Sequence, residues 1–95
     1  MSDAVSVRIP TILRTYTDGA SEVTVEPSTP TLSGVLDALE AAHPGIRARI
    51  LDDDGALRRF VNIYVGDEDV RFAGGLDTET PAGSEISVIP AVAGG

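Results

Sequence analysis

The sequence predicts an α+β domain in which one amphipathic helix covers one face of a mixed sheet. Two observations lead to this prediction. Segments of alternating apolar and polar residues, the pattern of half-buried strands, lie near the beginning and at the end of the chain, and a segment of β-favouring residues follows the middle. Between them, one segment has the period of a helix. Ninety-five residues have room for one modest core, so we expect residues 1–95 to form a single domain.

The beginning of the chain predicts a hairpin of two strands. The segments VSVRIP (5–10) and EVTVE (22–26) both alternate, and Asp18-Gly19 between them is a dipeptide typical of turns. We therefore expect the chain to reverse near this dipeptide. The side chains expected to point inward are Val5, Val7, Ile9, Val23 and Val25.

The segment TLSGVLDALEAAHPG (31–45) predicts the helix. Its larger apolar residues recur at i, i+3, i+4 and i+7, which places them on one helix face: Leu32, Val35, Leu36 and Leu39. Thr31 can cap this helix because its hydroxyl accepts an N–H that has no partner in the first turn. Gly34 should weaken that turn by about 1 kcal/mol relative to alanine. Pro44-Gly45 ends the helix, and IRARIL adds a short helical turn after it.

The second half of the chain predicts three more strands. Residues 60–65 favour a strand, Gly66 to Glu68 reverse the chain, and residues 69–72 return as a short strand. The last strand is expected at 85–90, with Ile86 and Val88 inward. The order β-β-α-β-β-β suits the ubiquitin-like β-grasp fold, in which the final strand lies beside the first.

The charge and composition of the chain argue against several classes of protein. Fifteen acidic residues against seven basic ones give a net charge of −8, which repels nucleic acid. Without cysteine, there is no disulfide, thiolate nucleophile or cysteine-ligated metal site. No segment has the pattern of a signal peptide or of a membrane-spanning helix, so we expect a cytoplasmic protein. We also expect the free protein to be a monomer. Every basic residue is arginine, so the chain offers no lysine amine as an acceptor for isopeptide bonds.

The body of the chain offers no convincing catalytic or metal-binding group. His43 is the only histidine and has no second histidine or cysteine nearby, so we expect it to end the helix. The acidic stretch 52–54 lacks the acidic residue that would close a calcium loop at the required spacing, so we expect a solvated turn. The acidic stretch 67–69 has no predicted cleft that could shift the pKa of a carboxylate, so we expect the charged tip of a hairpin. We therefore expect no catalytic residue, no metal and no bound cofactor.

The C-terminal tail, residues 91–95, ends in Gly94-Gly95. This ending is either a frayed end or a reactive terminus. Glycine has no Cβ, so a Gly-Gly end can pass through a narrow channel, and we expect the tail to be flexible beyond the last strand. The Gly95 carboxylate is unreactive until activated. Adenylation by ATP would activate it, and a sulfur nucleophile could then convert it to a thiocarboxylate.

The segment SVIPAVAGG resembles the C-terminus of the MoaD/ThiS family of sulfur carriers, which end in Gly-Gly and have the β-grasp fold. VRIPTILRTYT, LDALEAAHPGIRARI and RFVNIYVGDEDVRFAGGLDT resemble the members that serve cysteine biosynthesis in actinobacteria. The resemblance implies that Gly95 is the site of adenylation and thiocarboxylate formation, and that Val92, Ala93 and Gly94 complete the tail motif. It implies a protein cosubstrate rather than an enzyme, with ATP consumed by the activating partner.

The resemblance also implies three partner enzymes. An adenylating, E1-like sulfurtransferase would load the sulfur, a PLP-dependent cysteine synthase would supply the carbon skeleton, and a metalloprotease would release the cysteine adduct. Other roles stay open at this point: the small subunit of molybdopterin synthase, a carrier for another sulfur-containing metabolite, or a ubiquitin-like modifier joined through Gly95 to lysines of other proteins.

Strand parity predicts a docking surface for such partners. Ile89 faces opposite to the inward residues of the last strand, and Phe60 and Tyr64 face opposite to those of their own strand. In a β-grasp sheet these two strands are neighbours, so the three side chains would share the exposed face next to the tail. Exposed apolar clusters mark protein interfaces.

Overall fold

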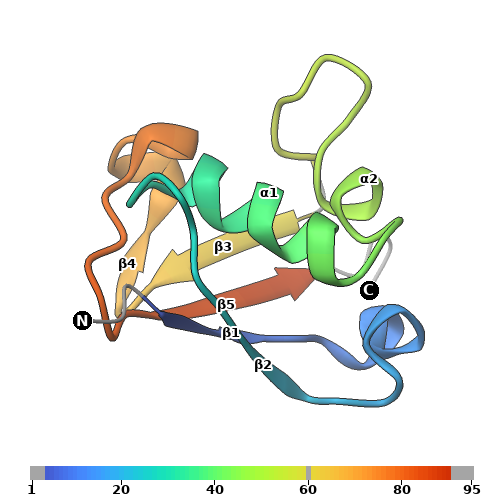
Figure 1. The fold of residues 1–95 in the computed structure, drawn as a ribbon. Coiled ribbons are helices and arrows are strands. Elements are labelled where there is room, and N and C mark those ends of the chain that lie inside the picture. Colours follow the sequence, from blue (N-terminus) through green and yellow to red (C-terminus); the bar gives the residue numbers. More distant parts are fainter. Residues whose placement is uncertain (1–3, 60, 91–95) are drawn as a thin grey trace.

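The computed structural model describes residues 4–59 and 61–90, which form a five-stranded mixed sheet with helices packed on it (Figure 1). We write η for a 3-10 helix. The elements in chain order are β1 (Val5–Arg8), η1 (Thr11–Thr17), β2 (Glu22–Val25), α1 (Leu32–Ala42), α2 (Arg47–Ile50), β3 (Val61–Val65), β4 (Glu68–Asp69), η2 (Val70–Phe72), η3 (Gly75–Asp77) and β5 (Glu85–Pro90).

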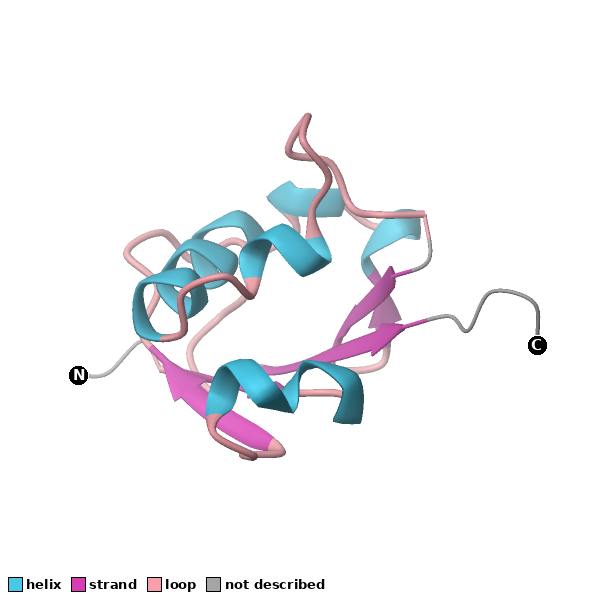
Figure 2. Ribbon diagram, turned by 90° about the vertical axis from the view of Figure 1, so that its right-hand side faces the viewer, coloured by secondary structure: helices cyan, strands magenta, loops and turns pink. Residues whose placement is uncertain are grey.

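The sheet has the strand order β2-β1-β5-β3-β4. The central strands β1 and β5 are parallel, and the other neighbouring pairs are antiparallel. Both α1 and α2 lie on one face of the sheet, as Figure 2 shows from the side. This arrangement confirms the predicted α+β class, with the last strand beside the first and one main helix across the sheet.

The predicted hairpin is present, but its connection is longer than a tight turn. β1 and β2 pair antiparallel, and a seven-residue 3-10 helix, η1, lies between them. Its Leu13 is buried in the core, which gives the connection a hydrophobic anchor. The chain then reverses at Asp18 and Gly19, which have φ angles of 55° and 88°. Asp18-Gly19 is therefore the reversal point, as the sequence predicts.

Helix α1 begins where Thr31 caps it. The Thr31 hydroxyl oxygen accepts the Gly34 N–H at 3.2 Å, as expected of an N-cap. Gly34 has a role beyond a weak helix position, because a Cβ there would overlap the Thr29 carbonyl oxygen. The close approach of the preceding loop therefore requires glycine. The four apolar residues predicted to share a face, Leu32, Val35, Leu36 and Leu39, are all completely buried.

The carboxylate of Glu40 connects the end of α1 to the start of α2. One oxygen accepts the Gly45 N–H and the other accepts the Arg47 N–H, both at 2.9 Å. These two hydrogen bonds stabilise the charged carboxylate, so they lower the pKa of Glu40 below its usual value. His43 is the C-cap of α1, where its N–H donates to the Leu39 carbonyl. This is the helix-end position expected from the sequence.

The strand expected at 69–72 is wrong in extent. β4 contains only Glu68 and Asp69, and the chain continues as the 3-10 helix η2. The Asp69 carboxylate accepts the Arg71 N–H at 2.9 Å, which caps η2 and ends the strand. Val70 turns into the core and is completely buried. Burial of one side chain and a local cap therefore outweigh the strand preference of this short segment.

The core lies between α1 and the helix-facing side of the sheet. The inward residues predicted in β1 and β5 are buried there, as is Val25, while Val23 is half-buried. The buried apolar residues are Val5, Val7, Ile9, Leu13, Val25, Leu32, Val35, Leu36, Leu39, Ile46, Ile50, Leu51, Val61, Ile63, Val70, Ile86 and Val88.

Candidate functional site

The residues predicted to carry the chemistry lie outside the described part of the chain. These are Gly95, Gly94, Ala93 and Val92, together with the rest of the tail. Their predicted flexibility and reactivity stay predictions. The described site therefore consists of the surface around the end of β5, where Pro90 is the last described residue before the tail.

At its end, β5 separates from one of its two neighbours. The parallel register with β1 extends to Ser87, whereas the antiparallel register with β3 continues to Pro90, which pairs with Val61. β1 ends at Arg8, and the chain then leaves the sheet and forms η1. The last residues of β5 are therefore paired with β3 alone.

On the open face of the sheet, the structure brings together two of the three predicted docking residues. Ile89 is 46% exposed, and Tyr64 is half-buried. In the register of β3 and β5, Ile89 pairs with Asn62 and Tyr64 pairs with Ser87, so all four side chains share this face. Phe60 lies outside the described residues. The described patch is an apolar pair between polar neighbours, and its docking role stays a prediction.

A hollow of about 400 Å³ lies on the helix side of the same strand end. No sequence pattern predicts this hollow, because its lining residues come from four separate segments of the chain. Ile12 at its edge is 68% exposed. The lining residues are Ile12, Arg49, Asp52, Arg58, Arg59, Val61 and Pro90. Three of the seven arginines of an acidic chain therefore gather beside the start of the tail.

Two of these arginines are held by specific contacts. The Arg49 Nε–H donates to the Tyr16 hydroxyl at 2.6 Å, and its guanidinium lies 5.9 Å from the centre of that ring. The Arg58 Nε–H donates to the Ala48 carbonyl at 3.1 Å. Asp52, in the same hollow, uses one carboxylate oxygen to accept two N–H groups of its own loop. The hollow is thus lined by positioned positive charges, which suit carboxylates of a partner.

A further arginine fixes the chain that leads into β3. The Arg71 Nη2 donates to the Arg58 carbonyl at 2.8 Å and to the Val61 carbonyl at 2.6 Å. This joins η2 to the backbone that borders the hollow. Phe72, the next residue, is 89% exposed. Among the described residues, the exposed large hydrophobic side chains are Ile12, Phe72 and Ile89.

In residues 4–59 and 61–90, no group of three or more His, Cys, Asp or Glu could hold a metal ion. The acidic stretch 52–54 forms a turn, because the Asp52 carboxylate accepts the Asp54 and Ala56 N–H groups. None of the helices in this part of the chain is long and apolar enough to cross a membrane.

The sheet order and helix placement define a ubiquitin-like β-grasp protein. Comparison of sequences assigns it further: the pattern of the ThiS family matches residues 7–95, and the chain belongs to that family. The match extends from β1 to the last glycine of the tail.

Named relatives agree with this assignment. The chain is 52% identical to the sulfur carrier protein CysO of Mycobacterium tuberculosis, over 96% of this chain and 98% of that protein. The CysO in a crystal structure of the Amycolatopsis orientalis BexX/CysO complex matches with a TM-score of 0.86 at 48% identity, covering 96% and 99% of the two chains. SAMP1 from Haloferax volcanii matches with a TM-score of 0.79 at 30% identity, covering 97% and 99%.

Proposed function

We propose that this protein is a sulfur carrier whose Gly95 carboxylate is adenylated and converted to a thiocarboxylate that supplies sulfur for cysteine biosynthesis. The observation that carries the proposal is the ThiS-family match, which includes Gly94-Gly95, together with 52% identity to a sulfur carrier protein over nearly its whole length. The chain acts as a cosubstrate of partner enzymes rather than as an enzyme, because all of the chemistry takes place on its own terminal carboxylate.

The chemistry has two steps. In the first, a Gly95 carboxylate oxygen attacks the α-phosphorus of ATP, pyrophosphate leaves, and an acyl-adenylate forms. In the second, hydrosulfide attacks the acyl carbon, the bond to the AMP oxygen breaks, and AMP leaves with a thiocarboxylate remaining on Gly95. The activating partner binds and consumes the ATP. The product is a good nucleophile at neutral pH, because a thiocarboxylic acid is largely ionised there.

The surface around the end of β5 supports docking of these partners. Ile89 and Tyr64 offer apolar contact on the open face, and the arginine-lined hollow offers positive charge on the helix side. A partner that contacts both sides would hold the start of the tail between them. The partners proposed are an adenylating sulfurtransferase, a PLP-dependent cysteine synthase and a metalloprotease that releases the cysteine adduct.

The test is the intact mass of the protein after incubation with ATP, the adenylating enzyme and sulfide. The wild type should gain the mass difference of one oxygen replaced by one sulfur. Deletion of Gly95, or addition of one residue after it, should abolish this gain because the carboxylate no longer reaches the ATP. Gly94→Val should slow loading, since its branched side chain would clash in a channel shaped for backbone.

A matched control is Ala82→Val, which adds the same branched side chain at an exposed turn before β5 and should load at the wild-type rate. Equal loading of the wild type and the Gly95 deletion would refute the carrier mechanism.

The similarity to SAMP1 supports a second candidate, a protein modifier attached through Gly95 to lysines of other proteins. Tagged wild-type protein would then form conjugates of higher mass in cells, and the Gly95 deletion would not. Because this chain contains no lysine, it could not be extended into chains through its own side chains. Thiocarboxylate formation without any conjugates would reject this candidate.

A further inference from the structure

The outer edge of β2 is open. β2 is the first strand in the sheet order, and no strand in the described part of the chain pairs with its outer side. The Ile9 N–H donates to the Ser21 carbonyl at 2.8 Å. In an antiparallel pair every second residue bonds to the neighbouring strand in this way, so Ser21, Val23 and Val25 direct their backbone groups toward β1. The residues between them, Glu22 and Thr24, therefore direct their backbone groups away from β1. The other edge strand, β4, has only two residues.

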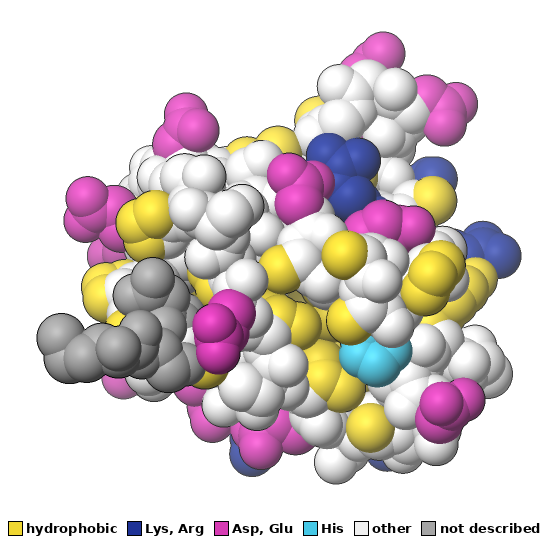
Figure 3. Space-filling view, viewed as in Figure 1, with side chains coloured by type: hydrophobic (Ala, Val, Ile, Leu, Met, Phe, Trp, Pro, Cys, Tyr) yellow, Lys and Arg dark blue, Asp and Glu magenta, His cyan; other side chains and the backbone are white. Residues whose placement is uncertain are grey.

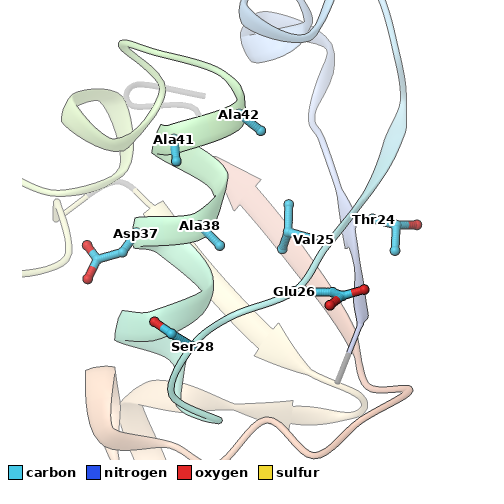
Figure 4. A pocket seen from close by; sticks show the side chains of 8 residues that line it. All are labelled: Thr24, Val25, Glu26, Ser28, Asp37, Ala38, Ala41 and Ala42. Carbon is cyan, nitrogen blue, oxygen red and sulfur yellow. The ribbon is translucent and has the colours of Figure 1, made fainter. Parts of the chain in front are cut away.

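A groove of about 600 Å³ runs along this edge between β2 and α1 (Figure 4). Ala38 and Ala42 point from α1 toward Val25 on β2, and Ala41 lines the same groove. The remaining lining residues are Thr24, Glu26, Ser28 and Asp37. Figure 3 shows hydrophobic surface in the hollow between the helix and the strand. A segment paired with β2 could therefore place alternate side chains on an apolar floor made of small residues.

The charges along β2 decide which kind of strand fits this edge. Glu22 begins the strand and Glu26 follows it, and both are exposed. A second copy of β2, paired antiparallel about Thr24, would place Glu22 opposite Glu26 at both ends. Like charges directly opposite each other destabilise a strand pair, whereas opposite charges stabilise it. The edge is thus unfavourable for a second copy and favourable for a strand with basic residues at both ends.

We propose that the outer edge of β2 binds an extended segment of a partner protein, which adds to the sheet as a further strand. Strand alternation gives the pattern of that segment. Lys or Arg lies opposite Glu22 and Glu26, a small polar residue lies opposite Thr24, and apolar residues between them rest in the groove near Val25. Backbone hydrogen bonds to Glu22 and Thr24 contribute affinity, and the charges contribute selectivity. The proposal is independent of the chemistry at Gly95.

The first experiment titrates a fluorescein-labelled peptide, GKVTVKG, with the full-length protein and follows its polarisation. Binding should saturate, and the acidic counterpart GEVTVEG should bind at least about tenfold more weakly. In backbone amide spectra, the shifts caused by GKVTVKG should lie in residues 22–26 and 37–42. Equal affinity for the two peptides, or shifts confined to another surface, would overturn the proposal.

Two variants test the backbone edge and the groove separately. Thr24→Pro removes an outward N–H without removing a bond to β1, and Thr24→Val keeps that N–H as its control. Ala41→Arg fills the groove, and Ala82→Arg adds the same charge at an exposed turn as its control. Each test variant should lower affinity about tenfold, and each control should stay within about twofold.

The thermal midpoint establishes that each variant is folded, and Ala41→Arg carries the test if Thr24→Pro unfolds the protein. Wild-type affinity in Ala41→Arg would show that the peptide does not use the groove. A wild-type dimer that Thr24→Pro dissociates would show that a second copy covers the edge. Either result would overturn the proposal.

Discussion

The two ends of β5 lie in different surroundings, although only a few residues separate them. At the first end, Ile86 is completely buried and is paired on both sides, with Val7 of β1 and with Val65 of β3. At the last end, Ile89 is exposed and Pro90 is paired only with β3. Strand parity turns Ile86 toward the core and Ile89 toward the open face, and the departure of β1 leaves the last residues of β5 with one neighbouring strand instead of two.

The same difference extends to the structure around each end. Near the first end, the loop before β5 is tied to the start of α1: the Leu32 N–H donates to the Thr78 carbonyl, and the Thr80 N–H donates to the Pro30 carbonyl, both at 2.9 Å. Near the last end, charged and apolar side chains line an open hollow. Stability should therefore depend on the first end and partner recognition on the last.

The largest difference is expected between two substitutions in the same strand. Ile86→Asp places an unpaired charge in the core and should destabilise the fold by more than about 4 kcal/mol, which unfolds a domain of this size. Ile89→Asp should change the free energy of unfolding by less than about 1 kcal/mol. It should nevertheless weaken binding to the adenylating enzyme by more than about tenfold, because it places a charge in a desolvated contact.

The measurements are the thermal midpoint of each variant and the affinity of the folded one for the adenylating enzyme. Unchanged affinity of Ile89→Asp would remove Ile89 from the docking surface. A collapse of its thermal midpoint would show that the last end of β5 is as important for stability as the first.

A smaller effect is expected at Gly34. Glycine to alanine inside a helix usually stabilises by about 1 kcal/mol, but here the new Cβ would overlap the Thr29 carbonyl oxygen. We expect a loss of about 1–3 kcal/mol, and a fall of the thermal midpoint of about 4–8 °C per kcal/mol. Ser33→Ala, at the preceding helix position, should stay within about 0.5 kcal/mol.

Well below its midpoint, Gly34→Ala should acquire sulfur at Gly95 at the wild-type rate, because its effect is confined to stability. A rise in the thermal midpoint would show that the loop at Thr29 moves freely away from the helix. Slower loading by the folded variant would show that the two ends of the sheet are coupled.

The smallest effect concerns Glu40, which joins α1 to α2. Its pKa is lowered in the folded state by hydrogen bonds from the Gly45 and Arg47 N–H groups. A carboxylate with a lowered folded pKa stabilises the protein above its ordinary pKa, 4.5, and loses this contribution as the pH falls through the folded value. The thermal midpoints of the wild type and Glu40→Gln should therefore differ at pH 7 and converge in acid. A difference that is constant with pH would contradict this assignment.

The sequence predicted the regular part of the fold well, because the apolar residues that recur at helical or strand spacing are the residues that the structure buries. Leu32, Val35, Leu36 and Leu39 repeat at helical spacing and are buried, and the parity of β5 correctly separates Ile86 from Ile89. It missed η1, since a 3-10 helix of seven residues has no distinct apolar period and Leu13 is its one buried apolar residue.

The surface of the site was harder to predict than the fold. Arg49, Arg58 and Ile12 come from three separate segments and line one hollow at the end of the sheet where β1 and β5 separate, and no local segment encodes that arrangement. Two features of the site could be recognised in the sequence. One is the Gly94-Gly95 ending, and the other is the alternation in the last strand, which places Ile89 on the face opposite the core. Tyr64 lies on the same open face as Ile89 but is half-buried rather than exposed.

The hydrogen bonds of Arg71 have a consequence for how quickly and how tightly partners bind. They hold the backbone carbonyls of Arg58 and Val61 in place at the border of the hollow before any partner arrives. A partner therefore meets a border that is already ordered and loses little conformational entropy in arranging it. Encounter should then depend mainly on orientation and charge, and partners of different affinity should differ chiefly in how long they remain bound.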